Sequence, residues 1–276
     1  MEWRALQEFR VGPGTAAAFV REFVDDLGPG RISKLAAWSA NAESSIAQGV
    51  RTVLGLAMDR LSDDDAIDRA LSPAKNTTLG GALNLTTLSK LTRALHLAHY
   101  GFRKKLSHTA DSQDQRHRMT PGSRPMLAAH YVGGEPDVIV PDLIRHNAQA
   151  LDLYMRIHRE TWKSIDAMLA DGVPAERALY LLPNAFPIRF EESGDLLNFH
   201  HKWTTRLCYT AQEEIWRSCL EEVQQVATVH PRIGAHIGPP CHMRRESKNT
   251  PICPEGTRYC GVPVWKLGLD EMKRVL

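Results

Sequence analysis

Long stretches with helical spacing alternate with short apolar runs beside prolines, and this alternation limits the folds open to the chain. Apolar residues recur at helical spacing over 15–27, 32–61, 86–107 and 143–170. Short extended pieces are expected at 138–140, 179–182 and 186–190. The sequence therefore predicts an α+β protein with more helix than strand.

Polar residues indicate where several of these helices begin and end. Gly28-Pro29-Gly30 should stop the first helix, and Ser62 ahead of three aspartates is typical of an N-cap. A helix is expected from Asp195 to about Cys208. Thr210 with Glu213 matches a capping box that begins the next helix or lies within a longer one.

The balance of charges excludes several classes of protein. The chain has 276 residues, 43% hydrophobic and 24% charged, which is typical of a globular protein. With 34 Lys and Arg against 32 Asp and Glu, the formal net charge is +2. Because no lysine-rich tail accompanies this near-neutral charge, we expect no nucleic-acid partner.

The chain also lacks the patterns of membrane and secreted proteins. No apolar run reaches the roughly 20 residues that cross a bilayer, and the N-terminus has no apolar signal core. We therefore expect a cytoplasmic protein without a membrane partner. Five cysteines, an odd number, do not suggest a disulfide framework and are interpreted as thiols or metal ligands.

A cluster of basic residues lies in the segment 112–124. Arg116, His117, Arg118 and Arg124 place three guanidinium groups and an imidazole within nine residues. A Pro121-Gly122 turn could fold Arg124 back onto the first two arginines. Guanidinium groups bind phosphate through paired N–H donors, so the cluster predicts an anionic ligand.

The alternative is a solvated basic face neutralised by Asp111 and Asp114. If the segment before Arg116 is helical, Asp114 and Arg118 form an i, i+4 ion pair. Gln113, Arg116 and His117 would then share one face and meet the ligand beside Ser123 and Arg124. Both interpretations remain open at the level of local sequence.

A second polar stretch runs from 195 to 217. On a helix, Lys202 and Arg206 are i, i+4 neighbours whose repulsion needs an anion nearby. Glu213 or Glu214 would supply that anion structurally, and a bound nucleotide would supply it functionally. His200 and His201 add imidazoles to the same stretch, although such histidines are more often packed than ligating.

Together the two stretches resemble the flavin-dependent thymidylate synthases, the ThyX family. Gln113-x-x-Arg116-His117-Arg118 resembles that family's signature. The resemblance continues through His96 to Phe102, Leu182-Pro183, Arg189, Asn198-Phe199, and Arg206 with Ala211-Gln212-x-Glu214-Ile215. It covers about residues 91–240, and two motifs in order are more specific than either alone.

This resemblance implies a fold and an assembly. It implies a ThyX-like fold, with a central, mostly antiparallel sheet flanked by long helices. We expect a helical N-terminal extension over 1–85, the ThyX-like domain over 86–240 and a cysteine-containing tail over 241–276. Family members are homotetramers with active sites shared between subunits.

The resemblance also implies an activity: FAD-dependent reductive methylation of dUMP to dTMP, with methylenetetrahydrofolate and NADPH as co-substrates. Arg206 would be catalytic because it matches the arginine that stabilises the ionised uracil. The residues implied to bind the substrate are Gln113, Arg116, Ser123 and Arg124. Those implied to bind the cofactor are His117, Arg118, Asn198 and His201.

Several positions depart from the family pattern. The segment 119–125 is shorter and lacks acidic and asparagine positions. Asp195 and Leu197 replace an asparagine and an arginine, and an aspartate near an FAD phosphate would repel it. Leu179 replaces an arginine, and His96 replaces an acidic residue. A methylase of another pyrimidine nucleotide, or a non-catalytic nucleotide-binding homologue, therefore remains an alternative.

The cysteines have two interpretations. Cys241, Cys253 and Cys260 with His242 could form a zinc site, but no Cys-x-x-Cys pair is present, so we expect no metal. We expect Cys208 to pack a helix rather than attack uracil. Because Rossmann, Walker, serine-hydrolase and zinc-protease motifs are missing, FAD would be held by arginines on helices.

Overall fold

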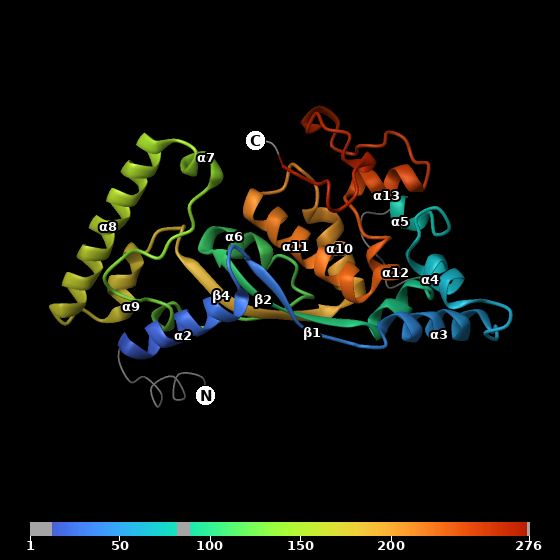
Figure 1. Cartoon of the computed structure of the whole chain (residues 1–276), viewed down its shortest axis with the longest axis horizontal. Coiled ribbons are helices and arrows are strands. Elements are labelled where there is room, and N and C mark those ends of the chain that lie inside the picture. Colours follow the sequence, from blue (N-terminus) through green and yellow to red (C-terminus); the bar gives the residue numbers. More distant parts are fainter. Residues whose placement is uncertain (1–12, 82–88, 275–276) are drawn as a thin grey trace.

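The computed structural model describes residues 13–81 and 89–274, and its centre is a four-stranded antiparallel sheet (Figure 1). The strand order is β1-β2-β4-β3. The strands are β1 (Ser33–Trp38), β2 (His99–Ser107), β3 (Gly122–Ser123) and β4 (Pro187–Asp195). Together with the surrounding helices, this sheet confirms the predicted α+β class.

The central pair, β2 and β4, pairs over its full length. The register runs from His99 opposite Asp195 to Ser107 opposite Pro187. Alternate residues of β2 are buried, namely Tyr100, Phe102, Lys104 and Leu106. Lys104 therefore points into the core, where a lysine requires buried carboxylates.

Two helices cover one face of the sheet: α10 (Leu196–Arg206) and α11 (Glu213–Val229) (Figure 1). From α10, Trp203 packs edge-on against Tyr100 and Phe102, with ring centroids 5.9 and 6.1 Å apart. From α11, Glu221 and Gln225 accept backbone N–H groups of 32–35 at 2.8 to 2.9 Å. These side chains satisfy the open edge of β1.

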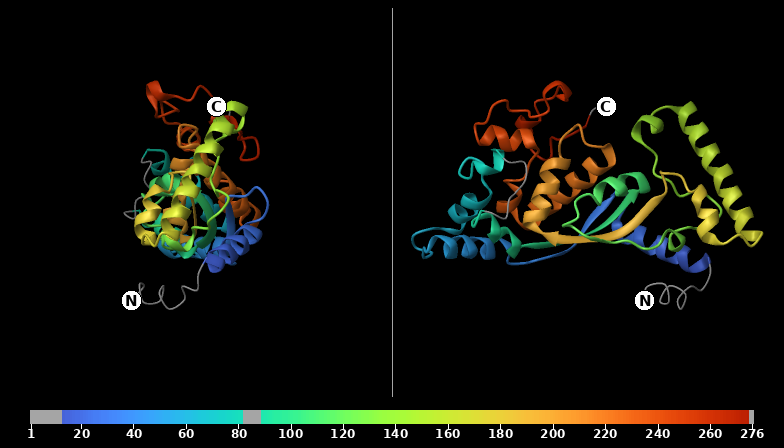
Figure 2. Two further views of the ribbon diagram at one scale, coloured as in Figure 1. Left: turned by 90° about the vertical axis from the view of Figure 1, so that its left-hand side faces the viewer. Right: turned by 180° about the vertical axis from the view of Figure 1, so that it is seen from behind.

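The remaining helices lie at the two ends of the molecule. At one end are α3 (Ala42–Leu54), α4 (Asp63–Leu71) and α5 (Thr78–Gly81). At the opposite end, α7 (Asp142–Arg145), α8 (Ala148–Ala170) and α9 (Ala175–Ala178) form an arm, and α2 (Pro13–Leu27) lies beside it. Figures 1 and 2 show α8 standing away from the sheet.

The C-terminal part is made of short elements. They are α12 (Pro231–Gly234), α13 (Pro240–Glu246), and the 3-10 turns Gly256–Arg258 and Val264–Lys266. Further 3-10 turns lie at Thr92–Leu97, Leu127–Ala129 and Leu179–Leu181. In the part of the chain that the structure describes, no helix is long and apolar enough to cross a membrane.

Two long helix predictions are wrong in part. The expected helix over 32–61 begins with β1 and becomes helical only at Ala42, ending before Gly55. The expected helix over 86–107 is a 3-10 turn followed by β2, while residues 86–88 lie outside the described residues. In both cases pairing between β1 and β2 overrides the local helical spacing.

Smaller differences concern the boundaries of elements. The helix expected over 143–170 is interrupted at Asn147, which caps α8. The pieces 138–140 and 179–182 are not strands, and Leu179–Leu181 forms a 3-10 turn. The cap of α11 is Gln212, not Thr210, because the Gln212 side chain accepts the N–H of Ile215 at 2.9 Å. Ser62 and Asp195 cap α4 and α10 as predicted.

Candidate active site

The two motif stretches meet at Arg206, the last residue of α10. Its Nε donates to Nε2 of His117 at 3.0 Å, and its Nη2 donates to the backbone oxygen of Gln113 at 3.3 Å. These partners are 89 and 93 positions away in sequence. The alternative partners Glu213 and Glu214 are not bonded to Arg206; Glu214 instead accepts the N–H and hydroxyl of Ser107.

His117 is an uncharged acceptor in this arrangement. Burial, together with the positive charges of Arg206 and Lys202, lowers the pKa of His117 to about 3. Because Nε2 accepts from Arg206, the ring proton belongs on Nδ1. The ring of His201 lies 5.6 Å from that of His117 and is tilted against it, so the two imidazoles are neighbours.

The basic cluster is less helical than predicted. The helix α6 (His108–Asp114) ends before Arg116, so the expected shared helical face is not formed. Asp114 is fully buried and pairs with Lys104 and Lys202, so the predicted ion pair with Arg118 is wrong. Arg116 and Arg118 are exposed, and neither forms an ion pair within residues 13–81 and 89–274.

Arg124 is held by the protein itself. Its guanidinium contacts the Asp111 carboxylate at 2.7 Å and lies 4.2 Å above the ring of Phe190. Gly122 lies in strand β3 rather than in the predicted turn, and Arg124 just after it contacts Asp111 instead of the first two arginines. Arg124 is therefore neutralised by an acid, which is the alternative to ligand binding. Ser123 is exposed on β3.

Asn198 lies beside a carboxylate that is already well satisfied. Asp195 accepts the backbone and side-chain N–H groups of Asn198 at 2.9 to 3.0 Å, and its other oxygen lies 2.8 Å from Nδ1 of His96. His96 and Asp195, two departures from the family pattern, therefore contact each other. This pairing reduces the repulsion that Asp195 would exert on an anion.

Lys202, one turn before Arg206, is neutralised inside the protein. It belongs to the buried ion cluster, defined as Lys104, Asp114, Glu192, Lys202 and Glu222. Their side chains are completely buried. Lys104 and Lys202 outweigh burial and lower the pKa of the Asp114 carboxyl, so it is ionised. Sequence reasoning missed Lys104, Glu192 and Glu222, although charged residues in apolar alternation indicate such a cluster.

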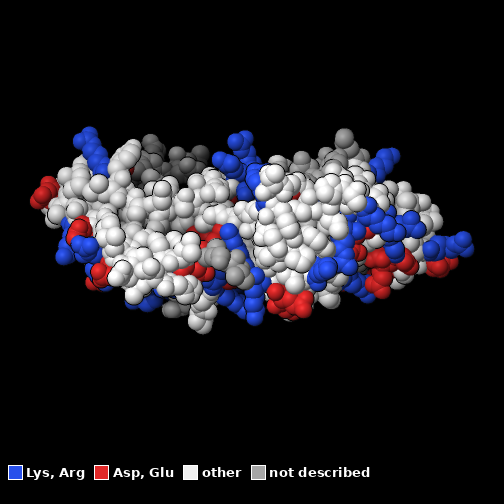
Figure 3. Space-filling model, turned by 90° about the horizontal axis from the view of Figure 1, so that it is seen from above, with Lys and Arg blue, Asp and Glu red and all other residues white. Residues whose placement is uncertain are grey.

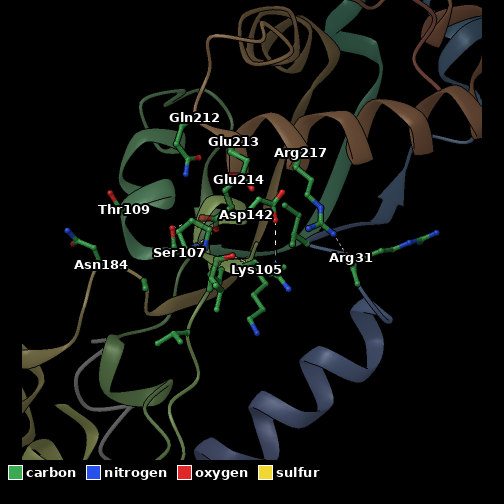
Figure 4. Close-up of a pocket in the computed structure, with 18 of the residues that line it drawn as sticks. Arg31, Lys105, Ser107, Thr109, Asp142, Asn184, Gln212, Glu213, Glu214 and Arg217 are labelled. Carbon is green, nitrogen blue, oxygen red and sulfur yellow. Dashed lines mark hydrogen bonds and ion pairs between the residues drawn. The ribbon is translucent and has the colours of Figure 1, made fainter. Parts of the chain in front are cut away.

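A separate cavity of about 1230 Å³ lies beyond the other end of α6 (Figure 4). Ser107 and Thr109 line it from the junction of β2 and α6, and Glu214 lines it from the start of α11. Burial raises the pKa of Glu214 and lowers that of Lys105. None of the predicted site residues lines this cavity.

The cysteines gather in a different place. Cys208, Cys241, Cys253 and Cys260 line one small cavity beside the C-terminal tail. Burial raises the pKa of the Cys241 thiol to about 12. Over the described ranges, no three His, Cys, Asp or Glu side chains are grouped as metal ligands.

The charges on the visible surface are mixed. On the face seen in Figure 3, Lys and Arg side chains are interspersed with Asp and Glu. Oppositely charged side chains also pair between elements, as where Arg232 of α12 contacts Asp64 of α4 at 2.8 Å. This face presents no continuous basic track of the kind that follows a nucleic-acid backbone.

Comparison with known proteins agrees with the motifs. The sequence model of a family described as thymidylate synthase complementing protein matches residues 34–232. The match begins within β1 and ends within α12. The match therefore includes β1, which lies outside the residues 91–240 that carry the motif resemblance.

Several characterised proteins are similar over shorter ranges. The flavin-dependent thymidylate synthase of Sulfurisphaera tokodaii is 30% identical over 115 residues, which cover 41% of this chain and 44% of that protein. The enzyme of the same name from Saccharolobus solfataricus is 26% identical, covering 50% and 53%, and that of Geobacter sulfurreducens is 29% identical, covering 56% and 65%. The chain thus spans about half the length of the relatives it matches.

Proposed function

This chain belongs to the family of thymidylate synthase complementing proteins, and from that membership we propose that it is a flavin-dependent thymidylate synthase. The proposed reaction is the reductive methylation of dUMP to dTMP, with methylenetetrahydrofolate as carbon donor and NADPH as reductant. The observation that carries the proposal is the junction of Arg206 with His117 and Gln113, because it joins both motifs in one place.

The proposed catalytic role of Arg206 follows from its remaining donor. Nε and Nη2 are bonded within the protein, while Nη1 has no partner among the described residues. A planar guanidinium fixed on one edge presents the other edge in a defined direction. Hydrogen bonding and positive charge from that edge would stabilise the negative oxygen of a uracil ring whose C5 attacks the transferred carbon.

Substrate binding is proposed for the side chains around this junction. Arg116 would contact the phosphate as an exposed cation without a protein partner in the described ranges, and the Gln113 side chain would bind the base. Ser123 and Arg124 would border the phosphate. Since Arg124 is already paired with Asp111, its contribution would be weaker than that of Arg116.

The residues present fit an FAD site in charge and in hydrogen bonding. Arg118 supplies an exposed cation, and His117 and His201 supply imidazole rings against which a flat ring system could pack. The amide N–H groups of Asn198 are taken by Asp195, which leaves the Asn198 carbonyl as an acceptor. When bound, FAD would supply the hydride and carry the transferred carbon.

A second candidate, methylation of another pyrimidine nucleotide, is favoured by one observation. The ion pair between Arg124 and Asp111 removes a cation from the short segment 119–125. A pocket that binds phosphate with one fewer cation would accept nucleotides that differ from dUMP around the phosphate.

Reconstitution with FAD separates these functions. The purified protein is expected to be yellow, or to bind FAD stoichiometrically when it is added. The loaded protein should then convert dUMP to dTMP with both co-substrates, as measured by chromatography of the nucleotides. A protein that cannot be loaded with FAD would contradict both enzymatic proposals. FAD binding with turnover of another pyrimidine nucleotide only would support the second.

A further inference from the structure

The segment that carries the three adjacent basic residues is fixed at both ends to the buried ion cluster. Asp114 directly precedes the segment 115–119, and Thr120 directly follows it. At the first end, Oδ2 of Asp114 lies 3.1 Å from Nζ of Lys104 and 2.8 Å from Nζ of Lys202. At the second end, the anchor is a hydroxyl group.

Thr120 connects the segment to Glu192. Its side-chain oxygen lies 2.9 Å from Oε1 of Glu192 and 3.0 Å from the backbone oxygen of His117, and Thr120 is 2% exposed. The Thr120 N–H also donates to the His117 oxygen at 3.1 Å. Glu192 in turn accepts Lys202 at 2.5 and 2.7 Å, so both anchors belong to one connected set of bonds.

We propose that Asp114 and Thr120 are positioning residues, which hold the segment 115–119 in its ligand-binding conformation through the buried ion cluster. The consequence of this anchoring for catalysis rests on the proposed function, because the segment carries Arg116 and Arg118. Neither anchor contacts the reacting atoms. They act through the backbone that they fix.

The segment 115–119 needs such anchors because it is largely exposed, whereas Asp114 and Thr120 at its two ends are buried. Arg116, Arg118 and Met119 are exposed, so packing restrains them little. Ordering each backbone residue costs about 1 to 2 kcal/mol of conformational entropy. The cluster resists displacement because moving one member would leave a buried charge unpaired.

Lys202 extends this effect to Arg206. Lys202 lies one helical turn before Arg206 on α10 and contacts Asp114 and Glu192. The same contacts that fix the basic segment therefore fix the end of the helix that carries Arg206. The junction between His117 and Arg206 is formed between two elements held by one cluster.

The test replaces only the hydroxyl of Thr120. Thr120→Val keeps the shape and the methyl group but removes the hydroxyl that contacts Glu192 and the His117 backbone oxygen, and Thr120→Ser restores the hydroxyl. Thr228→Val is the matched control, since among the described residues that hydroxyl bonds only the Gln224 oxygen of its own helix. Amide hydrogen exchange of the full chain, measured by mass spectrometry without added FAD, reports on 115–119 directly.

Exchange in 115–119 should accelerate about fivefold in Thr120→Val, as expected for one lost hydrogen bond. It should remain at the wild-type rate in Thr120→Ser and Thr228→Val. With dUMP, KM should rise in Thr120→Val more than kcat falls, and it should recover in Thr120→Ser. Unchanged exchange in Thr120→Val, equal acceleration by valine and serine, or faster exchange with an unchanged KM would overturn the proposal.

Two features keep this test independent of the proposed function. If wild-type protein does not turn over dUMP, the exchange rates still decide whether the anchors hold the segment. If Thr120→Val does not fold, Thr120→Ala takes its place, because it removes the same hydroxyl without adding a methyl group beside Glu192. Exchange in 115–119 that stays at the wild-type rate in Thr120→Ala would equally overturn the proposal.

Discussion

Arg206 has two of its three nitrogens fixed by the protein, and this determines what a substitution there would do. Lysine carries the same charge but cannot donate to His117 and Gln113 while also facing a substrate. The flexible lysine side chain would offer one ammonium group in place of the two edges of a fixed, planar guanidinium. A lysine that keeps only the positive charge of Arg206 would therefore not replace its function.

Arg206→Lys should lower kcat/KM for dUMP roughly 100-fold, comparable to removal of one donor to a developing oxyanion. Steady-state kinetics of the FAD-loaded protein measures the change. Arg258→Lys is the matched control, because the Arg258 side chain is 81% exposed and its one ion pair within the described ranges is with Glu255 in the tail. Near-wild-type turnover by Arg206→Lys would remove Arg206 from the mechanism.

Two buried histidines and the half-buried His117 make the fold sensitive to acid. Burial is the largest cause that lowers the pKa of His117 and His200 to about 3 and that of His130 to about 4. The unfolded chain protonates these rings near pH 6.5. The unfolded state thus binds more protons between these values, so stability falls as the pH is lowered from about 6.5 to about 4.

Urea denaturation at pH 7.5, 6 and 5 should show this loss of free energy of unfolding. His130→Phe should flatten the dependence, because both nitrogens of His130 are buried without a hydrogen-bond partner and its ring already stacks on Phe19. Equal pH dependence in the variant and the wild type would show that His130 is not buried in its neutral form.

At the level of elements, the sequence predicted ends of helices better than strands. Ser62 and Asp195 were recognisable as caps because a side-chain oxygen bonds an N–H three residues later, which is a local effect. β1 and β2 were missed because their pairing joins residues about 70 positions apart, and local spacing does not contain that information.

The candidate site was predictable in the same limited way. The two motifs identified Arg206, His117 and Gln113, which the structure brings together. The partners of the charges were not predictable. Local spacing predicts an ion pair between Asp114 and Arg118, yet Asp114 lies in the core with Lys104 and Lys202. Lys104 belongs to strand β2, outside both motifs, so the motifs do not indicate this pairing.

The cap of α10 offers a test at this scale. Asp195→Ala should lower the free energy of unfolding by about 1 kcal/mol, since it removes the acceptor for the Asn198 N–H. Asp195→Asn should lose much less, because asparagine also caps helices. Thermal and chemical denaturation measure both changes, and equal destabilisation by alanine and asparagine would assign the effect to the ion pair with His96 instead.

At the scale of the whole molecule, the arm formed by α7, α8 and α9 carries apolar side chains that are exposed in a single chain. Leu153 and Ile157 lie one turn apart on α8 and are 47% and 50% exposed. Apolar side chains arranged this way are typical of subunit contacts. The homotetramer expected from the family resemblance would cover them.

Sedimentation analysis should therefore give a mass about four times 30.9 kDa for the wild type. Ile157→Glu should reduce the assembled fraction, because it places a charge in the apolar contact. Lys163→Glu, a charge change at an exposed position of the same helix, should leave assembly intact. A monomeric wild-type protein at micromolar concentration would contradict this expectation.

The central claim is that Arg206, held by His117 and Gln113, serves methylation at C5 of a uracil nucleotide. Methylation at this carbon replaces its hydrogen, so the most direct measurement is tritium release from dUMP labelled at C5. The FAD-loaded protein with methylenetetrahydrofolate and NADPH should release tritium in step with dTMP formation, and Arg206→Lys should slow both together. FAD-loaded protein that binds dUMP but neither releases tritium nor forms dTMP would contradict the claim.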